Sequence, residues 1–231
     1  MSHLLFNVAE GQSVRVEVEY ALNGGYAGRD TEKVQHHIDE LARLGVPGPE
    51  RIPTMYPLPA MLAVQDDHVQ VAHGQTSGEA EWALIVPADA ASADDYLVTA
   101  ACDHTDRALE VHGVAWSKQA SPDLLGDVAW RYGDVKASFD DFSLRAWVTH
   151  DGVDTLIQDG TPAELLSVDH WIARLGEAGL LRPGTVFLGG TIGMVPEVDQ
   201  FADAWRVELA DRDGNVSTVA YTVEVLPEPW Q

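Results

Sequence analysis

Alternating apolar and polar residues predict β-strands over most of the chain. In residues 13–22 (SVRVEVEYAL), Val14, Val16 and Val18 alternate with charged side chains, which is typical of a half-exposed strand. Two longer segments, 144–160 and 202–226, predict hairpins that turn at Asp151-Gly152 and near Asp213-Gly214. Shorter runs of the same kind predict strands at 61–65, 68–74, 79–86, 95–102, 109–116 and 185–190.

Helical periodicity is limited to a few segments. Residues 31–45 predict a helix capped by Thr31 and ended by Gly45, with one apolar stripe. Residues 167–179 predict a second helix, and Ser121-Pro122 predicts the start of a short third one. The five prolines of 46–59 predict an extended loop. Strands dominate without strict βαβ alternation, so we expect an α+β fold, mostly β, with a rolled or barrel-like mixed sheet and few helices.

Length and charge narrow the function classes. The chain has 231 residues, 37 acidic against 14 basic, and a formal net charge of −23. Such a surface repels nucleic acid and makes anionic membranes poor partners. No apolar run of membrane-spanning length and no signal peptide occur, so we expect a cytoplasmic protein. Cys102 is the only cysteine, which excludes an internal disulfide.

Two glutamates in the predicted strand 79–86 are the first candidate for chemistry. Glu79 and Glu81 project to one side of the strand, where their charges repel each other. A divalent cation would remove this repulsion, and Asp103, at the end of the next apolar run, would be a third oxygen ligand. Oxygen ligands without a cysteine cluster suit Mg²⁺, Mn²⁺ or Ca²⁺. The alternative is an exposed E-x-E pair on an edge strand.

Three further features add candidates. Lys118 follows an apolar run and would be a cation beside the metal, or else a solvated lysine. His37 lies in the apolar stripe of its helix, and Glu40 could orient its ring as a base dyad, although a core histidine is a common alternative. Gly190-Thr191 ends a strand and could offer backbone N–H groups and a hydroxyl to a carboxylate, or be an ordinary turn.

The order of these features resembles the fumarylacetoacetate hydrolase superfamily. Five features follow one another between residues 26 and 191. They are an H-x-x-E helix before a proline-rich stretch, an E-x-E pair, a D-x-T-x-R motif at a strand end, a lysine and a Gly-Thr turn. The resemblance implies a dyad, a catalytic lysine, three metal ligands and three substrate-binding residues. The dyad is His37 and Glu40, and the catalytic lysine is Lys118. The metal ligands are Glu79, Glu81 and Asp103. The substrate-binding residues are Arg107, Gly190 and Thr191. The sequence departs from the family pattern in a shorter spacing between Asp103 and Lys118, and in Gly189 and Ile192 around the Gly-Thr turn.

The resemblance also implies a fold and an activity. We expect a single domain over 1–231, in which 1–60 hold the N-terminal strands, a lid-like helix and the proline-rich loop, and 61–231 form a metal-binding β-roll. The implied protein is a homodimer with Mg²⁺ (or Mn²⁺ or Ca²⁺) that hydrolyses a C–C bond in a β-dicarbonyl, acylpyruvate-like 2-oxo acid. Its substrate would be a small carboxylic acid, and its role catabolic.

Three alternatives remain open at this point. The same enolate-stabilising site could serve a decarboxylase, hydratase or isomerase of a 2-oxo acid. It could also belong to a metal- or ligand-binding protein without turnover. Finally, an acidic structural domain could carry the E-x-E pair as surface decoration.

Overall fold

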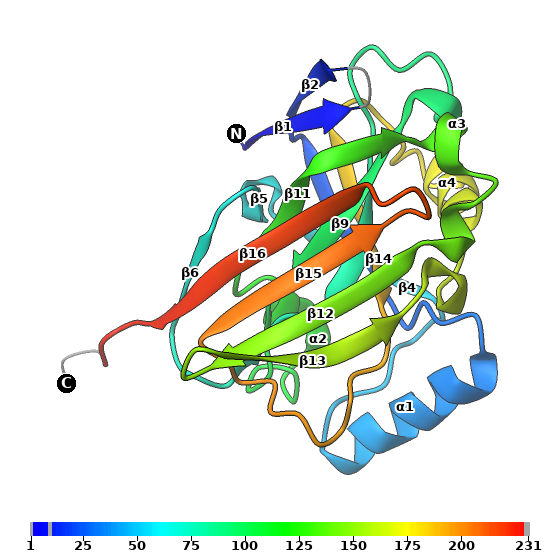
Figure 1. Ribbon diagram of the computed structural model, residues 1–231. Helices are drawn as coiled ribbons and strands as arrows, with labels where there is room; N and C mark the ends of the chain where they lie inside the picture. The colour runs from blue at the N-terminus through cyan, green and yellow to red at the C-terminus, as the bar shows by residue number, and fades with distance from the viewer. Residues whose placement is uncertain (1, 9–10, 229–231) are drawn as a thin grey trace.

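Two β-sheets packed face to face form the protein, as the computed structural model of residues 2–8 and 11–228 shows (Figure 1). The larger sheet has the strand order β2 (Gln12–Glu17), β1 (His3–Val8), β11 (Asp123–Arg131), β9 (Leu97–Asp103), β8 (Ala80–Ile85), β14 (Thr185–Thr191), β3 (Tyr20–Gly25) and β4 (Thr54–Leu58), with β5 (Ala63–Val64) beside β11. The smaller sheet has the order β13 (Val153–Gly160), β12 (Ser143–His150), β15 (Ala204–Ala210), β16 (Val216–Val225) and β6 (His68–Val71). The predicted fold class, mostly β with a mixed sheet, is confirmed.

Short elements complete the chain. The helices are α1 (Thr31–Arg43), α2 (Val114–Lys118), α3 (Tyr132–Val135) and α4 (Val168–Glu177). Two-residue strands β7 (Thr76–Ser77) and β10 (Thr105–Asp106) pair with each other. Single 3-10 turns occur at Ala60–Leu62, Ala93–Asp95, Phe139–Asp141 and Pro162–Glu164. Among the described residues, no helix is long and apolar enough to cross a membrane.

Successive residues of the larger sheet alternate between two cores. Trp82 and Phe187 pack between the sheets, together with Trp205 of the smaller sheet. Ala83 and Ile85 instead contribute to a second core on the opposite face. Because side chains two apart on a strand share a face, Glu81 lies on the face of this second core, away from the smaller sheet.

Both predicted hairpins are confirmed. Strands β12 and β13 turn at Asp151 and Gly152, whose φ angles are 50° and 78°. Two successive positive φ angles are what a two-residue hairpin turn requires. Strands β15 and β16 are joined by the second hairpin. The helix at 167–179 is also confirmed as α4, with the Ser167 side chain accepting from the His170 N–H.

Several local predictions are wrong. The segment after Ser121-Pro122 is the strand β11, because its apolar residues Leu124 and Leu125 are buried through pairing with β9. Residues 109–116 form turns and the start of α2 instead of a strand. The predicted strand 13–22 is two strands, β2 and β3, and the proline-rich segment contains the edge strand β4, where Pro57 needs no ladder N–H.

Helix α1 is far less buried than its apolar stripe suggests. Its cap is Asp30, whose carboxylate accepts from the Glu32 and Lys33 N–H groups, and not Thr31. Val34 alone among its residues is buried, and Leu44 at its end is 73% exposed. Figure 1 shows α1 beside the two sheets instead of between them. The helix is therefore held by few contacts.

Candidate metal centre

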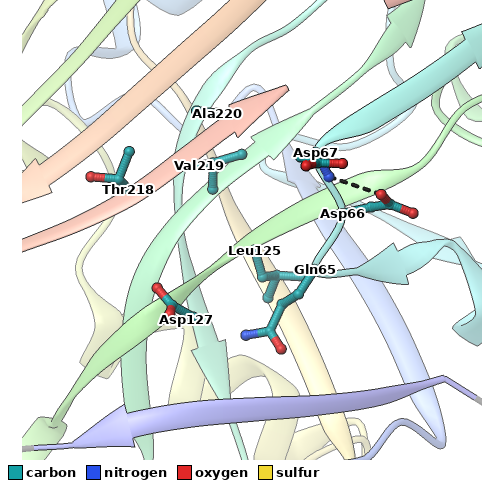
Figure 2. Close-up of a pocket in the computed structure, with 8 residues that line it drawn as sticks. All are labelled: Gln65, Asp66, Asp67, Leu125, Asp127, Thr218, Val219 and Ala220. Carbon is teal, nitrogen blue, oxygen red and sulfur yellow. Dashed lines mark hydrogen bonds between the residues drawn. The ribbon is translucent and has the colours of Figure 1, made fainter. Parts of the chain in front are cut away.

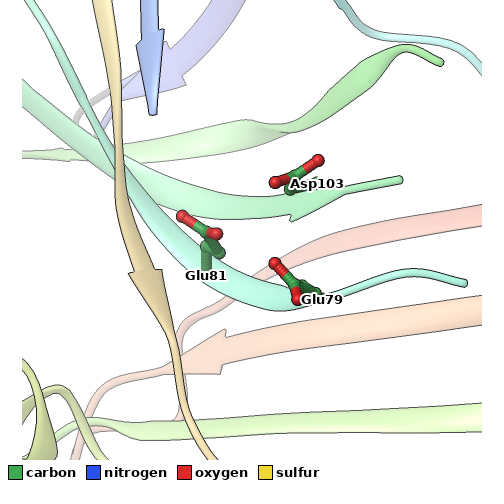
Figure 3. Close-up of side chains that lie close together, drawn as sticks. All are labelled: Glu79, Glu81 and Asp103. Atoms are coloured by element: carbon green, nitrogen blue, oxygen red, sulfur yellow. The ribbon is translucent and has the colours of Figure 1, made fainter. Parts of the chain in front are cut away.

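Three carboxylates from two neighbouring strands come together at one end of the larger sheet. Glu79 immediately precedes β8, Glu81 lies within it, and Asp103 is the last residue of β9. One oxygen of each lies within 4.8 Å of the others (Figure 3). The Asp103 N–H donates to the Glu79 carbonyl at 3.1 Å, which fixes the two strand ends side by side. The spacing seen in the sequence thus produces a cluster of oxygen ligands.

An asparagine from a more distant strand joins two of these carboxylates. Asn23, in β3, donates from Nδ2 to Glu81 Oε1 at 3.2 Å and to Asp103 Oδ2 at 3.1 Å. Its side chain is fully buried, and its Oδ1 atom has no hydrogen-bond partner among the described residues. Sequence reasoning missed Asn23. The available signal was an uncharged polar residue directly after the apolar pair Ala21-Leu22.

Lys118 supplies a buried positive charge to the cluster. Its Nζ donates to Glu79 Oε2 at 3.0 Å and to Asp103 Oδ2. Burial alone would lower the pKa of Lys118, but Asp103 and Glu79 raise it well above its ordinary value. The residue comes from the end of α2, and not from a strand end as predicted. The ammonium group is therefore held charged against two of the three carboxylates.

Arg107 holds the remaining side of Glu79. Its Nη2 lies 2.9 Å from Glu79 Oε1, its Nη1 donates to Glu110 at 2.9 Å, and its Nε donates to Ser77 at 2.7 Å. Burial would raise the pKa of Glu79, but Lys118 and Arg107 together lower it to about 2. The guanidinium of Arg107 is thus occupied by the protein. Its predicted role in substrate binding stays a prediction.

The other two carboxylates are less well neutralised. Burial raises the pKa of Glu81 well above its ordinary value, and the neighbouring Asp103 and Glu79 raise it further. Burial also raises the pKa of Asp103, despite the contact with Lys118. A hard divalent cation would favour the ionised form of both groups, and carboxylate oxygens are the ligands that Mg²⁺, Mn²⁺ and Ca²⁺ prefer. The donor set therefore fits such an ion.

The Gly-Thr turn at the end of β14 donates hydrogen bonds to Glu81 and to the backbone beside it. The Gly190 N–H donates to Glu81 Oε2 at 2.7 Å, and Thr191 Oγ1 donates to the Ala80 carbonyl at 2.9 Å. Gly190 has a φ of 95°, and a Cβ there would lie 2.7 Å from the Ala27 Cβ, so only glycine fits. The Gly190 N–H thus positions Glu81, and the predicted contact of this turn with a substrate carboxylate stays a prediction.

The predicted His37–Glu40 dyad is not formed. Glu40 faces His36, four residues away on α1, with His36 Nδ1 3.5 Å from Glu40 Oε1. His37 is exposed, and its ring centroid lies 6.4 Å from that of Tyr26. Tyr26 has a φ of 53°, an uncommon backbone conformation for a bulky residue, and is half-buried. Burial and then Glu110 raise the pKa of Tyr26.

The family model described as "Protein of unknown function (DUF2848)" matches residues 24–221, which include the three carboxylates, Arg107 and Lys118 and begin directly after Asn23. The chain belongs to the DUF2848 family. No curated protein matches the sequence.

Solved structures place this DUF2848 chain among proteins of the fumarylacetoacetate hydrolase fold. It is similar to fumarylpyruvate hydrolase from Pseudomonas aeruginosa in complex with Mn²⁺ and pyruvate, with a TM-score of 0.60, 15% identity, and coverage of 98% of this chain and 97% of that one. It is also similar to 2-keto-3-deoxy-D-arabinonate dehydratase complexed with magnesium and 2,5-dioxopentanoate, with a TM-score of 0.63, 16% identity, and coverage of 90% and 74%. The expected resemblance is confirmed at the level of the fold.

A separate hollow of about 320 Å³ lies over the junction of β11 and β16 (Figure 2). Its lining includes Asp66, Asp67 and Asp127, and the Asp67 N–H donates to Asp66 Oδ1 at 2.8 Å. All three aspartates are exposed, and none of the residues of the carboxylate cluster lines this hollow. It is therefore an open acidic depression distinct from the candidate metal centre of the DUF2848 chain.

Proposed function

We propose that this protein is a divalent-metal-dependent enzyme that acts on a small 2-oxo acid. The observation that carries the proposal is the convergence of Glu79, Glu81 and Asp103 within 4.8 Å beside the buried ammonium of Lys118. Proteins of the same fold have been solved with Mn²⁺ and pyruvate or with magnesium and 2,5-dioxopentanoate. Mg²⁺ is the expected ion, and Mn²⁺ or Ca²⁺ suits the same oxygen donors.

The proposed reaction is hydrolysis of the C–C bond of a β-dicarbonyl acid such as an acylpyruvate. A water oxygen adds to the distal carbonyl carbon, the C–C bond breaks, and its electron pair forms the enolate of the 2-oxo acid, which then takes a proton. When bound, the divalent cation would supply Lewis acidity that stabilises the enolate. Lys118 adds a fixed positive charge beside the developing oxyanion and can deliver the proton. Glu79 stays ionised between Arg107 and Lys118 and keeps that charge in place.

Activation of the water is assigned to His37. The support for this role is its position on α1 next to Tyr26, whose phenol is close enough to Glu110, Lys118 and Glu79 for their charges to shift its pKa. His37 is exposed as the helix stands, so the role requires α1 to close over the cluster. A helix with a single buried residue can move at low cost. Glu40 would not orient His37, because it faces His36.

A second candidate is lyase or isomerase chemistry on the same class of acid. The unformed dyad favours it, because decarboxylation, dehydration or isomerisation of a 2-oxo acid needs enolate stabilisation but no activated water at a distal carbonyl. One protein of the same fold is a dehydratase. In this alternative Lys118 remains the group that handles the proton, and His37 has no role.

The test is metal-dependent turnover. The protein is stripped with EDTA and reloaded with Mg²⁺ or Mn²⁺, and loss of acylpyruvate absorbance is followed beside CO₂ release from oxaloacetate. We expect turnover only in the reloaded protein, and its loss in Glu81→Gln. Glu17→Gln, at an exposed position of β2, is the matched control and should keep activity. Turnover that ignores EDTA, or that survives Glu79→Ala combined with Glu81→Ala, would refute the proposal. The homodimer and the cytoplasmic location stay predictions.

A further inference from the structure

Asp123 lies beside the carboxylate cluster and has no part in the function proposed so far. It begins β11 and is the antiparallel partner of Asp103 in β9. Directly opposite residues of an antiparallel pair project to the same face of a sheet. The Asp123 carboxyl therefore lies on the face of the metal centre, one strand beyond Asp103. Its other neighbouring strand, β5, offers only Ala63 at this position.

The Asp123 side chain is buried without a partner. Its exposed fraction is 0%, and neither Oδ1 nor Oδ2 has a hydrogen-bond partner among the described residues. Glu79, Glu81 and Asp103, by contrast, each accept from at least two protein donors. A buried polar group without a hydrogen bond costs about 1–3 kcal/mol, and more when it is charged. A water molecule at the centre would supply the missing donor.

A second orphaned oxygen lies on the opposite side of the cluster. Asn23 directs its Nδ2 to Glu81 and Asp103, while its Oδ1 is buried and unpartnered within the described part of the chain. In the sheet order β11-β9-β8-β14-β3, the triad comes from β9 and β8, and the two orphaned acceptors come from β11 and β3. Two independent acceptors thus lie on either side of the three ligand oxygens.

We propose that Asp123 accepts hydrogen bonds from the water ligands that complete the coordination shell of the cation. The oxygens that lie within 4.8 Å of one another come from Glu79, Glu81 and Asp103 and do not include Asp123, so it does not share the ion directly with all three. A six-coordinate ion with three protein oxygens leaves positions that water or substrate fills, and Mg²⁺ retains such waters. Asp123 is then a positioning residue that orients these ligands, and the inference rests on the proposed metal centre.

The experiment is calorimetric titration of Mg²⁺ and Mn²⁺ into the metal-free full-length protein. Asp123→Asn keeps the shape of the side chain but replaces one acceptor oxygen by a donor. We expect its metal affinity to fall about 10- to 100-fold, the range found when partners of metal ligands are removed. Asp127→Asn, the same change at an exposed position of the same strand, should bind like the wild type.

Two further measurements separate positioning from misfolding. Water-proton relaxation of the Mn²⁺-loaded protein should change in Asp123→Asn, because the number or exchange of coordinated waters changes. The metal-free variant should melt close to the wild type, since an unpaired buried carboxyl is replaced by an amide of the same shape. Asp123→Ala, which removes both acceptor oxygens, should lose at least as much affinity as Asp123→Asn and serves if the first variant does not fold.

The outcomes distinguish this inference from the proposed function. Wild-type affinity and relaxation in Asp123→Asn would overturn the role of Asp123 and leave the metal centre intact. A wild-type protein that binds neither Mg²⁺ nor Mn²⁺ would overturn both.

Discussion

Acid should destabilise the protein through one buried histidine. His104 follows Asp103 and is fully buried, with Nδ1 2.8 Å from the Tyr221 hydroxyl and Nε2 2.9 Å from Thr76 Oγ1. Burial, with a smaller contribution from Arg107, lowers its pKa from 6.5 to about 4. The folded state therefore binds the proton more weakly than the unfolded state does. The resulting stability is fully present above pH 6.5 and is lost as the pH falls through about 4.

The size of this effect follows from the shift. A pKa difference of about 2.5 units corresponds to about 3 kcal/mol, at 1.36 kcal/mol per unit. This is a large fraction of the about 5–15 kcal/mol that stabilises a typical domain. The assay is urea denaturation of the metal-free protein at about pH 7 and about pH 4.5, compared between the wild type and His104→Gln.

The difference between the two proteins isolates the histidine. The carboxylates titrate similarly in both, so the wild type should lose about 2–3 kcal/mol more than His104→Gln between these pH values. Equal losses would refute the argument. An NMR titration that finds His104 protonating near pH 6.5 in the folded protein would refute it as well.

Three further predictions concern the site. Gly190→Ala should destabilise the protein by about 1–3 kcal/mol in urea melts and weaken Mg²⁺ binding. The reason is that a methyl group at a φ of 95° displaces the N–H that holds Glu81. Unchanged Mg²⁺ affinity would contradict this. Lys118→Met should abolish turnover and lower the melting temperature of the metal-free protein, since it leaves Asp103 without its buried cation, at a cost of about 3–5 kcal/mol; added Mg²⁺ should recover part of that loss. His37→Ala should leave stability within about 0.5 kcal/mol but slow acylpyruvate hydrolysis about 100-fold or more, whereas His36→Ala should not; equal rates would favour the lyase alternative.

Local sequence patterns predicted the parts of the molecule that depend on local physics. Strand alternation and the Asp-Gly turns are determined by residues within a few positions of one another, and both hairpins formed where expected. The same alternation placed Glu79 and Glu81 on one side of their strand, and the apolar run before Asp103 placed that residue at a strand end. The three ligand candidates therefore needed no knowledge of the strand order.

The missed residues depend on which strands become neighbours. Asn23 contacts Glu81 across 58 residues and Asp103 across 80 residues of sequence. Asp123 reaches the site only because β11 pairs with β9. Ser121-Pro122 is a good local signal for a helix start, but burial of β11 between β9 and its parallel neighbours outweighed that preference.

For helix α1, the local pattern predicted the helix correctly but not its burial. Its apolar stripe is real in the sequence, yet only Val34 finds a partner in the core. Periodicity predicts that a helix has an apolar face and says nothing of what covers it. The His37–Glu40 dyad predicted on this helix is not formed, because His37 is exposed and Glu40 faces His36.

The larger sheet separates what can vary in this protein from what cannot. Five successive strands, from β11 to β3, contribute to the carboxylate cluster, and their side chains alternate between two apolar cores. Insertion or deletion of one residue in any of these strands would turn a polar group of the cluster toward the opposite face of the sheet. The exposed helix α1 and the loop that carries Glu110 lie outside this sheet and carry no such restriction on their length. Under the proposed function, substrate preference can therefore change through these segments, while the sheet keeps the carboxylate cluster fixed.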